Sequence, residues 1–481
     1  MTPLHRRNSA AAAAPPGRAR PGWTLLIVSV ALFMVTLDNL VVTTAIPSIR
    51  LDFGASLEDL EWTVNAYTLA YAVLLLPAAA LGDRLGRRRT FLAGMVLFTF
   101  ASVLAALAPS ADALVASRGV QGAGAAVVTP LTLTLLADAF PAKRGLAIGI
   151  WSGISGLGVA LGPLVGGAVV EGIAWQWIFW LNVPIGIVAV PLAARLLSES
   201  FGPARRIDAA GVALGSIALL GIVYGIVRGN AAGWGSLEVV ASIAAGFAGL
   251  GSFVAWEKRA AEPILPMRFF RSRAFAATSA VSLIMYLGIF GSIFLLAQVF
   301  QTAQGYGPFE AGLRTLPWTG MPMIVAPIAG LLSDRIGPRP LMVSGLALQS
   351  IAIGWIASVS AVDTPYAQLV PGFVLGGIGM ALVFAPAANA ILASVRPEEA
   401  GQASGATNAI REVGGAMGIA VLAAVFSAHG GYESPQAFMD GVEPALWTGS
   451  AILAVGAALA TLVPGRAKAP ATAAVPAPAA A

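Results

Sequence analysis

The sequence contains no cysteine, only two histidines and only three lysines among its 481 residues. Without cysteine there is no disulfide, no thiolate metal site and no thiol nucleophile. His5 and His429 both lie outside the long apolar runs, so no histidine relay is expected inside a membrane. No lysine stands in the Gly-Lys-Ser/Thr context of a phosphate-binding loop. We therefore expect no enzymatic activity, no bound cofactor and no metal site.

Charge is also scarce. Hydrophobic residues make up 57% of the chain and charged residues 11%, with a mean hydropathy of +0.81. These values lie outside the range of soluble globular proteins. The net charge is +5, but the basic residues stand singly between apolar runs and form no nucleic-acid-binding face. The composition predicts a protein that crosses the lipid bilayer many times and binds no nucleic acid.

The apolar runs are long enough to cross a bilayer as helices, which requires about 20 residues each. They are continuous, whereas a membrane β-barrel has alternating segments of about ten residues. The predicted fold class is therefore an all-α polytopic membrane protein. We count fourteen runs, at residues 23–46, 60–81, 90–108, 112–137, 145–170, 176–197, 208–228, 236–256, 275–301, 312–332, 340–360, 366–393, 402–427 and 444–463.

The arginines of the short loops indicate the orientation, because cytoplasmic loops of membrane proteins are enriched in basic residues. If the N-terminus lies inside, the outside segments hold only Arg50 and Arg228 among basic residues. The acids that they collect are Asp52, Glu58, Asp59, Glu61, Glu171, Glu238, Asp363, Glu433, Asp440 and Glu443. An even number of spans with both termini in the cytoplasm fits this asymmetry. Residues 1–22 and 464–481 are expected to be disordered cytoplasmic tails.

Asp38 is the one carboxylate in the first apolar run, which extends from Trp23 to Ile46. Ionised side chains at membrane depth are rare and usually functional. Removal from water disfavours the charged form, so reversible protonation near neutral pH is feasible. The sequence indicates Asp38 as the carrier of a coupling proton. The alternative is a carboxylate held permanently by an arginine as a packing device.

Arg118 lies inside the fourth run and is the expected partner of Asp38. Its guanidinium stays charged at any physiological pH. Gln121 follows three residues later on nearly the same helix face. Movement of Arg118 relative to Asp38 would couple the arrangement of the helices to proton affinity. The alternative is a buried arginine that bonds only to carbonyl groups at a helix end.

Two short loops have related sequences, LGDRLGRRR at residues 81–89 and LSDRIGPR at residues 332–339. Internal repeats of this kind are common in transporters. If the loops are equivalent, residues 23–197 and 275–463 form two six-helix bundles, and residues 198–274 add two linker helices between them. The alternative for each loop is a simple positively charged anchor on the cytoplasmic side.

The fifth run contains glycines at four-residue spacing around Pro163. Small residues at this spacing let helices approach closely, and the proline bends the helix. Close packing alone is the alternative to a functional role. The residues concerned are Gly158, Gly162, Pro163, Gly166 and Gly167.

Five segments, in order, resemble the major facilitator superfamily and specifically its fourteen-helix drug:proton antiporter branch. The resemblance implies two six-helix bundles plus two inserted helices, a bacterial plasma membrane location, a monomeric unit and the proton gradient as energy source. It also implies proton coupling through Arg118. In the family the glycine-proline pattern around Pro163 is an antiporter motif associated with exporters, and it implies export rather than uptake. The segments are residues 37–47, 83–89, 118–122, 158–167 and 175–186.

The resemblance further implies a conformational gate at the two repeated loops, in which Asp83 pairs with a helix end across the bundle interface and stabilises the outward-facing state. The chain departs from the family pattern at Ala79, where glycine is usual, and at Leu40 and Thr43 in the first helix. The predicted gate residues are Asp83, Arg84, Gly86, Arg87, Asp334 and Arg335.

Polar and aromatic side chains inside the apolar runs are candidates for a substrate cavity, since ligand pockets combine apolar walls with a few polar groups. Arg314 and the pair Arg411-Glu412 lie near predicted helix ends, where we interpret them as structural. The cavity candidates are Asn65, Tyr67, Gln121, Asn182, Tyr286, Gln298, Trp318, Asn389 and Asn408.

The leading interpretation is secondary active efflux of lipophilic or amphiphilic small molecules, including drugs and antibiotics, by alternating access coupled to protons. A single deep carboxylate favours neutral or singly charged cationic substrates. One alternative is a proton-linked importer of a small polar solute, which would need more charge in the cavity. Another is a non-transporting receptor or scaffold, which the lack of large extramembrane domains disfavours.

Overall fold

The computed structural model describes residues 21–140, 144–202, 208–396 and 399–465, and within these ranges every regular element is a helix. The elements are α1 (Pro21–Phe53), α2 (Leu57–Leu85), α3 (Arg87–Ala106), α4 (Ala111–Ala139), α5 (Arg144–Gly172), α6 (Trp177–Trp180), α7 (Asn182–Leu196), α8 (Ala209–Ala232), α9 (Leu237–Glu257), η1 (Met267–Arg271), α10 (Arg273–Gln298), η2 (Val299–Ala303), α11 (Pro308–Ile336), α12 (Pro338–Val359), α13 (Tyr366–Ala393), α14 (Ala400–His429) and α15 (Pro435–Ala460).

Each apolar run of the sequence corresponds to a helical segment, and the sixth run comprises α6 and α7 together. Among the described residues, 12 helices are long and apolar enough to cross a membrane, and 13 if α2, bent by 51° before Pro77, is one span. In α5, residues Leu161–Gly172 form a shorter apolar helix. The all-α membrane fold is confirmed, and the count of fourteen spans stays a prediction.

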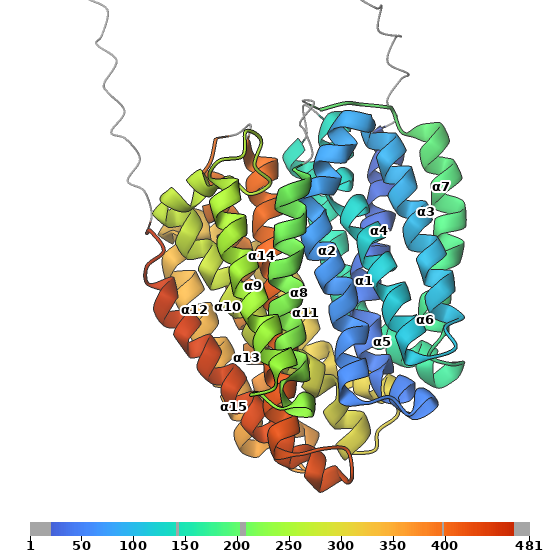
Figure 1. The fold of residues 1–481 in the computed structure, drawn as a ribbon, viewed down its shortest axis with the longest axis vertical. Helices are drawn as coiled ribbons and strands as arrows, with labels where there is room; N and C mark the ends of the chain where they lie inside the picture. Colours follow the sequence, from blue (N-terminus) through green and yellow to red (C-terminus); the bar gives the residue numbers. More distant parts are fainter. Residues whose placement is uncertain (1–20, 141–143, 203–207, 397–398, 466–481) are drawn as a thin grey trace, which may run out of the picture.

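The helices run side by side along the long axis of the molecule (Figure 1). Helices α1 to α7, the N-terminal group, pack mainly on one another, and so do α10 to α15, the C-terminal group. The groups meet where α5 packs on α11 and α2 on α14. Helices α8 and α9 pack on each other, and α8 also contacts α2 and α14 across the boundary between the groups.

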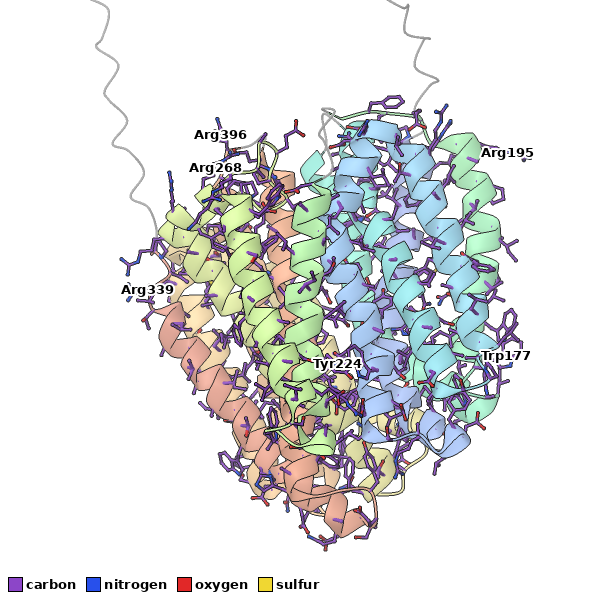
Figure 2. The ribbon with its side chains drawn as sticks, in the orientation of Figure 1. Trp177, Arg195, Tyr224, Arg268, Arg339 and Arg396 are labelled. Carbon is purple, nitrogen blue, oxygen red and sulfur yellow. The ribbon has the colours of Figure 1, made fainter. Side chains whose placement is uncertain are left out.

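Arginines of the expected cytoplasmic loops gather toward one end of the molecule. Figure 2 shows Arg195, Arg268 and Arg396 at the top of the view, Arg339 farther down at the left edge, and Trp177 and Tyr224 lower still. We name the arginine-rich end the basic end and the opposite end the far end. The assignment of the basic end to the cytoplasm stays a prediction, and it follows from the distribution of basic residues.

The two repeated loops have the same backbone form. Gly86 alone separates α2 from α3, and Gly337 alone separates α11 from α12. Their φ angles are 107° and 85°, in the region that favours glycine. Each also donates its backbone N–H to the residue four positions earlier, Gly82 or Ser333. The glycine of each loop is therefore required by the tight reversal between its two helices.

At the far end the two groups touch through polar contacts. The guanidinium of Arg50 lies 4.0 Å from the ring centroid of Tyr432. The side chain of Gln301 donates a hydrogen bond of 3.0 Å to the carbonyl oxygen of Thr44. Glu171 in α5 accepts a hydrogen bond from a backbone N–H at the start of α11. These contacts join α1 and α5 to the C-terminal group.

The glycines of α5 allow neighbouring helices to approach closely on two sides. A Cβ atom at Gly162 would lie 2.7 Å from the side chain of Leu40 in α1, and one at Gly167 would lie 2.2 Å from the carbonyl oxygen of Pro308 in α11. From the other side, a Cβ at Gly312 would lie 2.2 Å from the carbonyl oxygen of Pro163. Helices α5 and α11 therefore meet backbone to backbone, which only small residues permit.

This contact predicts that Gly312→Ala destabilises the protein. The added methyl group would overlap the backbone of α5, and overpacking of this kind costs about 1–3 kcal/mol. We expect a melting temperature lower by several degrees in thermal denaturation of the purified protein in detergent. Gly320→Ala is the matched control in the same helix, because nothing lies within 4 Å of a Cβ there. Equal melting temperatures for the two variants would contradict the close approach.

Candidate functional site

Asp38 lies near the middle of α1 and is almost fully buried, with a side chain 1% exposed. Its Oδ2 atom forms an ion pair with Nη1 of Arg118 at 2.6 Å, and this guanidinium is 0% exposed. The Oδ1 atom accepts hydrogen bonds from Gln121 at 2.8 Å and from Asn182 at 2.7 Å. Both carboxylate oxygens therefore have strong donors, as a buried charge requires.

The hydrogen-bond network extends beyond the carboxylate. Ser102 of α3 accepts hydrogen bonds from Gln121 at 2.8 Å and Asn182 at 3.3 Å. Nε of Arg118 donates to the carbonyl oxygen of Thr63 in α2 at 3.2 Å, and its Nη1 also donates to Oε1 of Gln121 at 2.6 Å. Five helices of the N-terminal group, α1, α2, α3, α4 and α7, thus contribute an atom to this site.

An aromatic ring covers the guanidinium of Arg118. Its carbon Cζ lies 4.3 Å from the ring centroid of Tyr67, a cation–π distance. Nη2 of Arg118 and the hydroxyl of Tyr67 are both buried, and neither has a hydrogen-bond partner among the described residues. The oxygens of Asp38 are therefore fully bonded, whereas Nη2 of Arg118 and the hydroxyl of Tyr67 are not.

Three of the predicted cavity residues, Tyr67, Gln121 and Asn182, thus belong to the Asp38 site itself. Asn65 is fully buried in α2, and neither its oxygen nor its nitrogen has a partner in the described part of the chain. Gln298 lies toward the far end, where its Oε1 accepts a hydrogen bond of 2.7 Å from the hydroxyl of Tyr432.

The other predicted cavity residues lie in the C-terminal group. Tyr286 is buried and stacks on Phe290, and Trp318 is buried in α11. Asn408 is half-buried in α14, whereas Asn389 is exposed near the end of α13. The structure therefore brings no single cluster together from all nine candidates.

The interpretation of Arg411 and Glu412 as residues near a helix end is wrong. They lie well inside α14, which begins at Ala400, and Arg411 is only 8% exposed. The error arose because the apolar pattern gave no sign of how deeply the polar first turns of α14 are packed. Arg314, in contrast, pairs locally with Glu310 at 2.6 Å.

Sequence reasoning also missed Glu61 and Ser102. Glu61, counted among the outside acids, is 3% exposed in α2, with one carboxylate oxygen that lacks a partner among the described residues. A lone serine in an apolar helix carries no distinguishing sequence signal, so Ser102 could not have been found. A glutamate in the first turns of a predicted span was a visible signal for Glu61.

The gate residues of the first loop form a cluster within the N-terminal group. Asp83 accepts a hydrogen bond from Nε of Arg87 at 2.8 Å, and Nη1 of Arg87 donates to Asp138 at 2.7 Å. In this structure Asp83 thus pairs with Arg87, and its pairing across the bundle interface in the outward-facing state stays a prediction. Arg84 and Arg335 are exposed at the surface. The side chain of Asp334 lies outside the described residues.

A second charge cluster at the basic end belongs to the C-terminal group. Glu399 precedes α14 and accepts hydrogen bonds from Arg396, at 2.7 Å, and from Arg268 of η1. The hydrogen bond from Arg396 and the pairing with Arg268 hold the pKa of the Glu399 carboxyl at about 2. The carboxylate is thus ionised at physiological pH and ties the loop before α10 to the start of α14.

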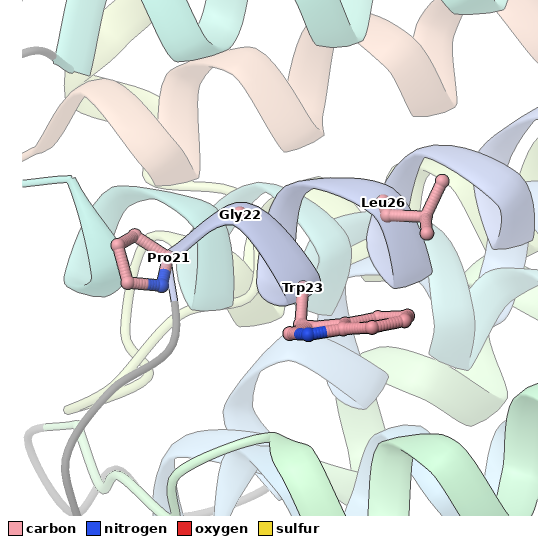
Figure 3. A pocket seen from close by; sticks show the side chains of 4 residues that line it. All are labelled: Pro21, Gly22, Trp23 and Leu26. Carbon is pink, nitrogen blue, oxygen red and sulfur yellow. The ribbon is translucent and has the colours of Figure 1, made fainter.

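A shallow surface pocket lies at the first turn of α1, lined by Pro21, Gly22, Trp23 and Leu26 (Figure 3). It contains no charged side chain and none of the predicted cavity residues. Leu26 is 12 residues from Asp38, or about 18 Å along a helix. Among the described residues, no group of three acidic or histidine side chains is placed to hold a metal ion. The Asp38 network is the strongest candidate site.

The sequence profile described as Major Facilitator Superfamily matches residues 28–419 and 278–478. The chain is similar to the tetracenomycin C resistance and export protein of Streptomyces glaucescens, with 35% identity over 91% of this chain and 82% of that protein. It is also 35% identical to multidrug resistance protein Stp of Mycobacterium tuberculosis, over 84% of this chain and 76% of that protein.

Among solved structures, a POT family transporter in complex with a thioalcohol-conjugated peptide superposes with a TM-score of 0.68 at 14% identity. The match covers 90% of this chain and 94% of that one, and it supports the fold alone. The helical architecture, the profile and the two relatives agree with one another. The chain is a multi-pass membrane protein that belongs to the major facilitator superfamily.

Proposed function

We propose that this protein is a proton-coupled efflux transporter, a drug:proton antiporter that exports lipophilic or amphiphilic small molecules by alternating access. The observation that carries the proposal is the buried ion pair of Asp38 and Arg118. It lies midway along α1 and has an isolated carboxylate that a proton can neutralise. The named functions of the two relatives, antibiotic export and multidrug resistance, support export over uptake.

The coupling step follows from the bonds of the carboxylate. Arg118, Gln121 and Asn182 all donate to Asp38 and stabilise its ionised form. If a helix movement separated Asp38 from Arg118, the buried charge would lose its partner, which costs several kcal/mol. Uptake of a proton removes that charge. Proton binding and the separation of the two side chains would therefore favour each other.

The conformational change would be a rocking of two bundles, residues 23–197 and 275–463, with residues 198–274 as linker helices. The far-end contacts of Arg50 and Gln301 would close the exterior side in the state described here. The gate loops would close the cytoplasmic side in the other state. A monomer in a bacterial plasma membrane, with both termini in the cytoplasm, suffices for this cycle. The proton gradient supplies the energy, and no cofactor is needed.

We expect Asp38→Asn to abolish transport driven by a pH gradient, because the amide cannot accept the coupling proton. In inverted membrane vesicles with an acidic lumen, the wild type should accumulate its substrate and the variant should not. Resistance of a pump-deficient host to a panel of antibiotics should fall in parallel at equal expression. Substrate loss from acid-loaded vesicles by the wild type would indicate import instead.

Two controls keep this experiment interpretable. Asp440→Asn removes an exposed acid of α15 and should leave resistance unchanged. Exchange of labelled substrate without a pH gradient should survive in Asp38→Asn if the protein is folded. Full gradient-driven accumulation by Asp38→Asn would refute the proposed coupling role.

Arg118→Lys tests whether coupling depends on the geometry of the guanidinium. An ammonium group is a point charge that cannot reach Asp38, Gln121 and the Thr63 carbonyl together. Loss of one charge-assisted hydrogen bond should reduce the coupled transport rate by about tenfold or more. The exposed Arg339→Lys is the control. A rate equal to the wild type in Arg118→Lys would show that a positive charge alone is sufficient.

A further inference from the structure

The C-terminal group contains a second buried arginine whose surroundings differ from those of Arg118. Arg411 lies in α14, where only Nη1 has an acceptor, Oδ1 of Asn408 at 3.4 Å. Nε and Nη2 are buried and have no acceptor among the described residues. The neighbouring Glu412 interacts with Arg411 electrostatically, yet the two form no ion pair in the described part of the chain.

Two other arginines that lie near aromatic rings have a carboxylate partner. Arg118 pairs with Asp38, and Arg314, which lies over Tyr306, pairs with Glu310. A guanidinium remains charged at all physiological pH values, so protonation cannot relieve its burial. Unused donors on a buried charge cost several kcal/mol. Arg411 therefore needs an acceptor that the described residues do not supply.

The two unused donors, Nε and Nη2, lie on the same edge of the guanidinium. This edge presents two parallel N–H groups, the arrangement that binds a carboxylate in a bidentate pair. The other edge holds Nη1, the atom that contacts Asn408. The free edge of Arg411 is thus shaped for an anionic group with two oxygens, or for two adjacent acceptor oxygens.

Aromatic rings lie near the guanidinium of Arg411. Cζ of Arg411 lies 5.2 Å from the ring centroid of Phe384 and 5.9 Å from that of Tyr286. Tyr286 stacks on Phe290 with centroids 4.7 Å apart and an interplanar angle of 11°. Such faces bind planar aromatic molecules by stacking. Because α14 packs on α2, the cluster lies beside the boundary between the two helix groups.

Glu412 interacts electrostatically with Tyr67 and Tyr71 of α2 and also with Tyr286 of α10. A carboxylate can lose its charge by taking a proton, whereas the guanidinium of Arg411 cannot. A cation at Glu412 would also leave the free donors of Arg411 unsatisfied. The arrangement therefore favours an anionic ligand at Arg411 over a cationic ligand at Glu412.

We propose that Arg411 is the recognition site for planar aromatic substrates that carry an anionic oxygen group, such as a carboxylate. The ring system stacks against Phe384 and Tyr286, and the anionic group accepts hydrogen bonds from Nε and Nη2. This assignment rests on the proposed export function and names its substrate class. It differs from the neutral or cationic class that Asp38 alone suggested.

Binding of two matched probes to the purified full-length protein tests this site. Anthraquinone-2-carboxylate and anthraquinone-2-carboxamide have the same ring system and differ in the charge of the substituent. We expect calorimetric titration to show that the wild type binds the carboxylate at least about tenfold more tightly than the amide. In Arg411→Gln the two dissociation constants should become equal.

Arg411→Lys keeps the positive charge and is the variant to titrate if Arg411→Gln does not fold. Its preference for the carboxylate should fall to roughly threefold, because an ammonium group cannot form two parallel bonds. Arg314→Gln, which removes an arginine already paired with Glu310, should keep the full preference. Ethidium is the cationic probe, and its affinity should not decrease in Glu412→Gln.

Three results would overturn the assignment: no preference for the carboxylate in the wild type, a full preference that survives in both Arg411 variants, or loss of ethidium binding in Glu412→Gln. The titration needs no proton gradient, so its failure is separate from failure of proton-coupled export. A wild type that exports antibiotics but shows no carboxylate preference would leave the export function standing and remove this site.

Discussion

The neutralisation of one buried carboxylate governs the N-terminal half of this protein. Asp38 can remain ionised away from water only because Arg118, Gln121 and Asn182 surround its two oxygens. These donors come from two helices, α4 and α7, and Ser102 of α3 and the Thr63 carbonyl of α2 add two more helices to the network. A shift of any one helix would leave a charge or donor unsatisfied. The network therefore holds the five helices in register as a single unit.

The C-terminal half contains a buried charge that has no ion-pair partner among the described residues. Its buried Arg411 has donors that the described residues leave unused, and rings rather than carboxylates surround it. The carboxylate of Asp38 is thus neutralised within the N-terminal group, whereas the guanidinium of Arg411 has no carboxylate partner among the described residues. Such a division suits a transporter in which the N-terminal group handles the proton and the C-terminal group recognises the substrate. Coupling would then pass through α2 and α14, which contact each other.

The sequence was sufficient to predict the helices, because continuous apolar runs of spanning length have few alternative structures. It also led to Asp38 and Arg118, since charges stand out in apolar runs. It did not reveal Ser102, whose role depends on the rotation of α3 about its axis. It placed Arg411 near a helix end, because depth along a helix depends on where the neighbouring helices pack. The apolar pattern of a sequence does not determine which side chains of different helices contact one another.

The interface between α5 and α11 shows how the two halves can be tightly joined and still move. At Gly167 and Gly312 the two backbones come into direct contact. Deep interdigitation of long side chains would resist rocking, because each would have to leave its groove. A contact made of glycines and carbonyl groups has no such barrier, and the polar contacts of Arg50 and Gln301 can form or break at the surface. The glycines that permit close packing would thus also permit alternating access, so the two explanations of the glycine-rich helix are not exclusive.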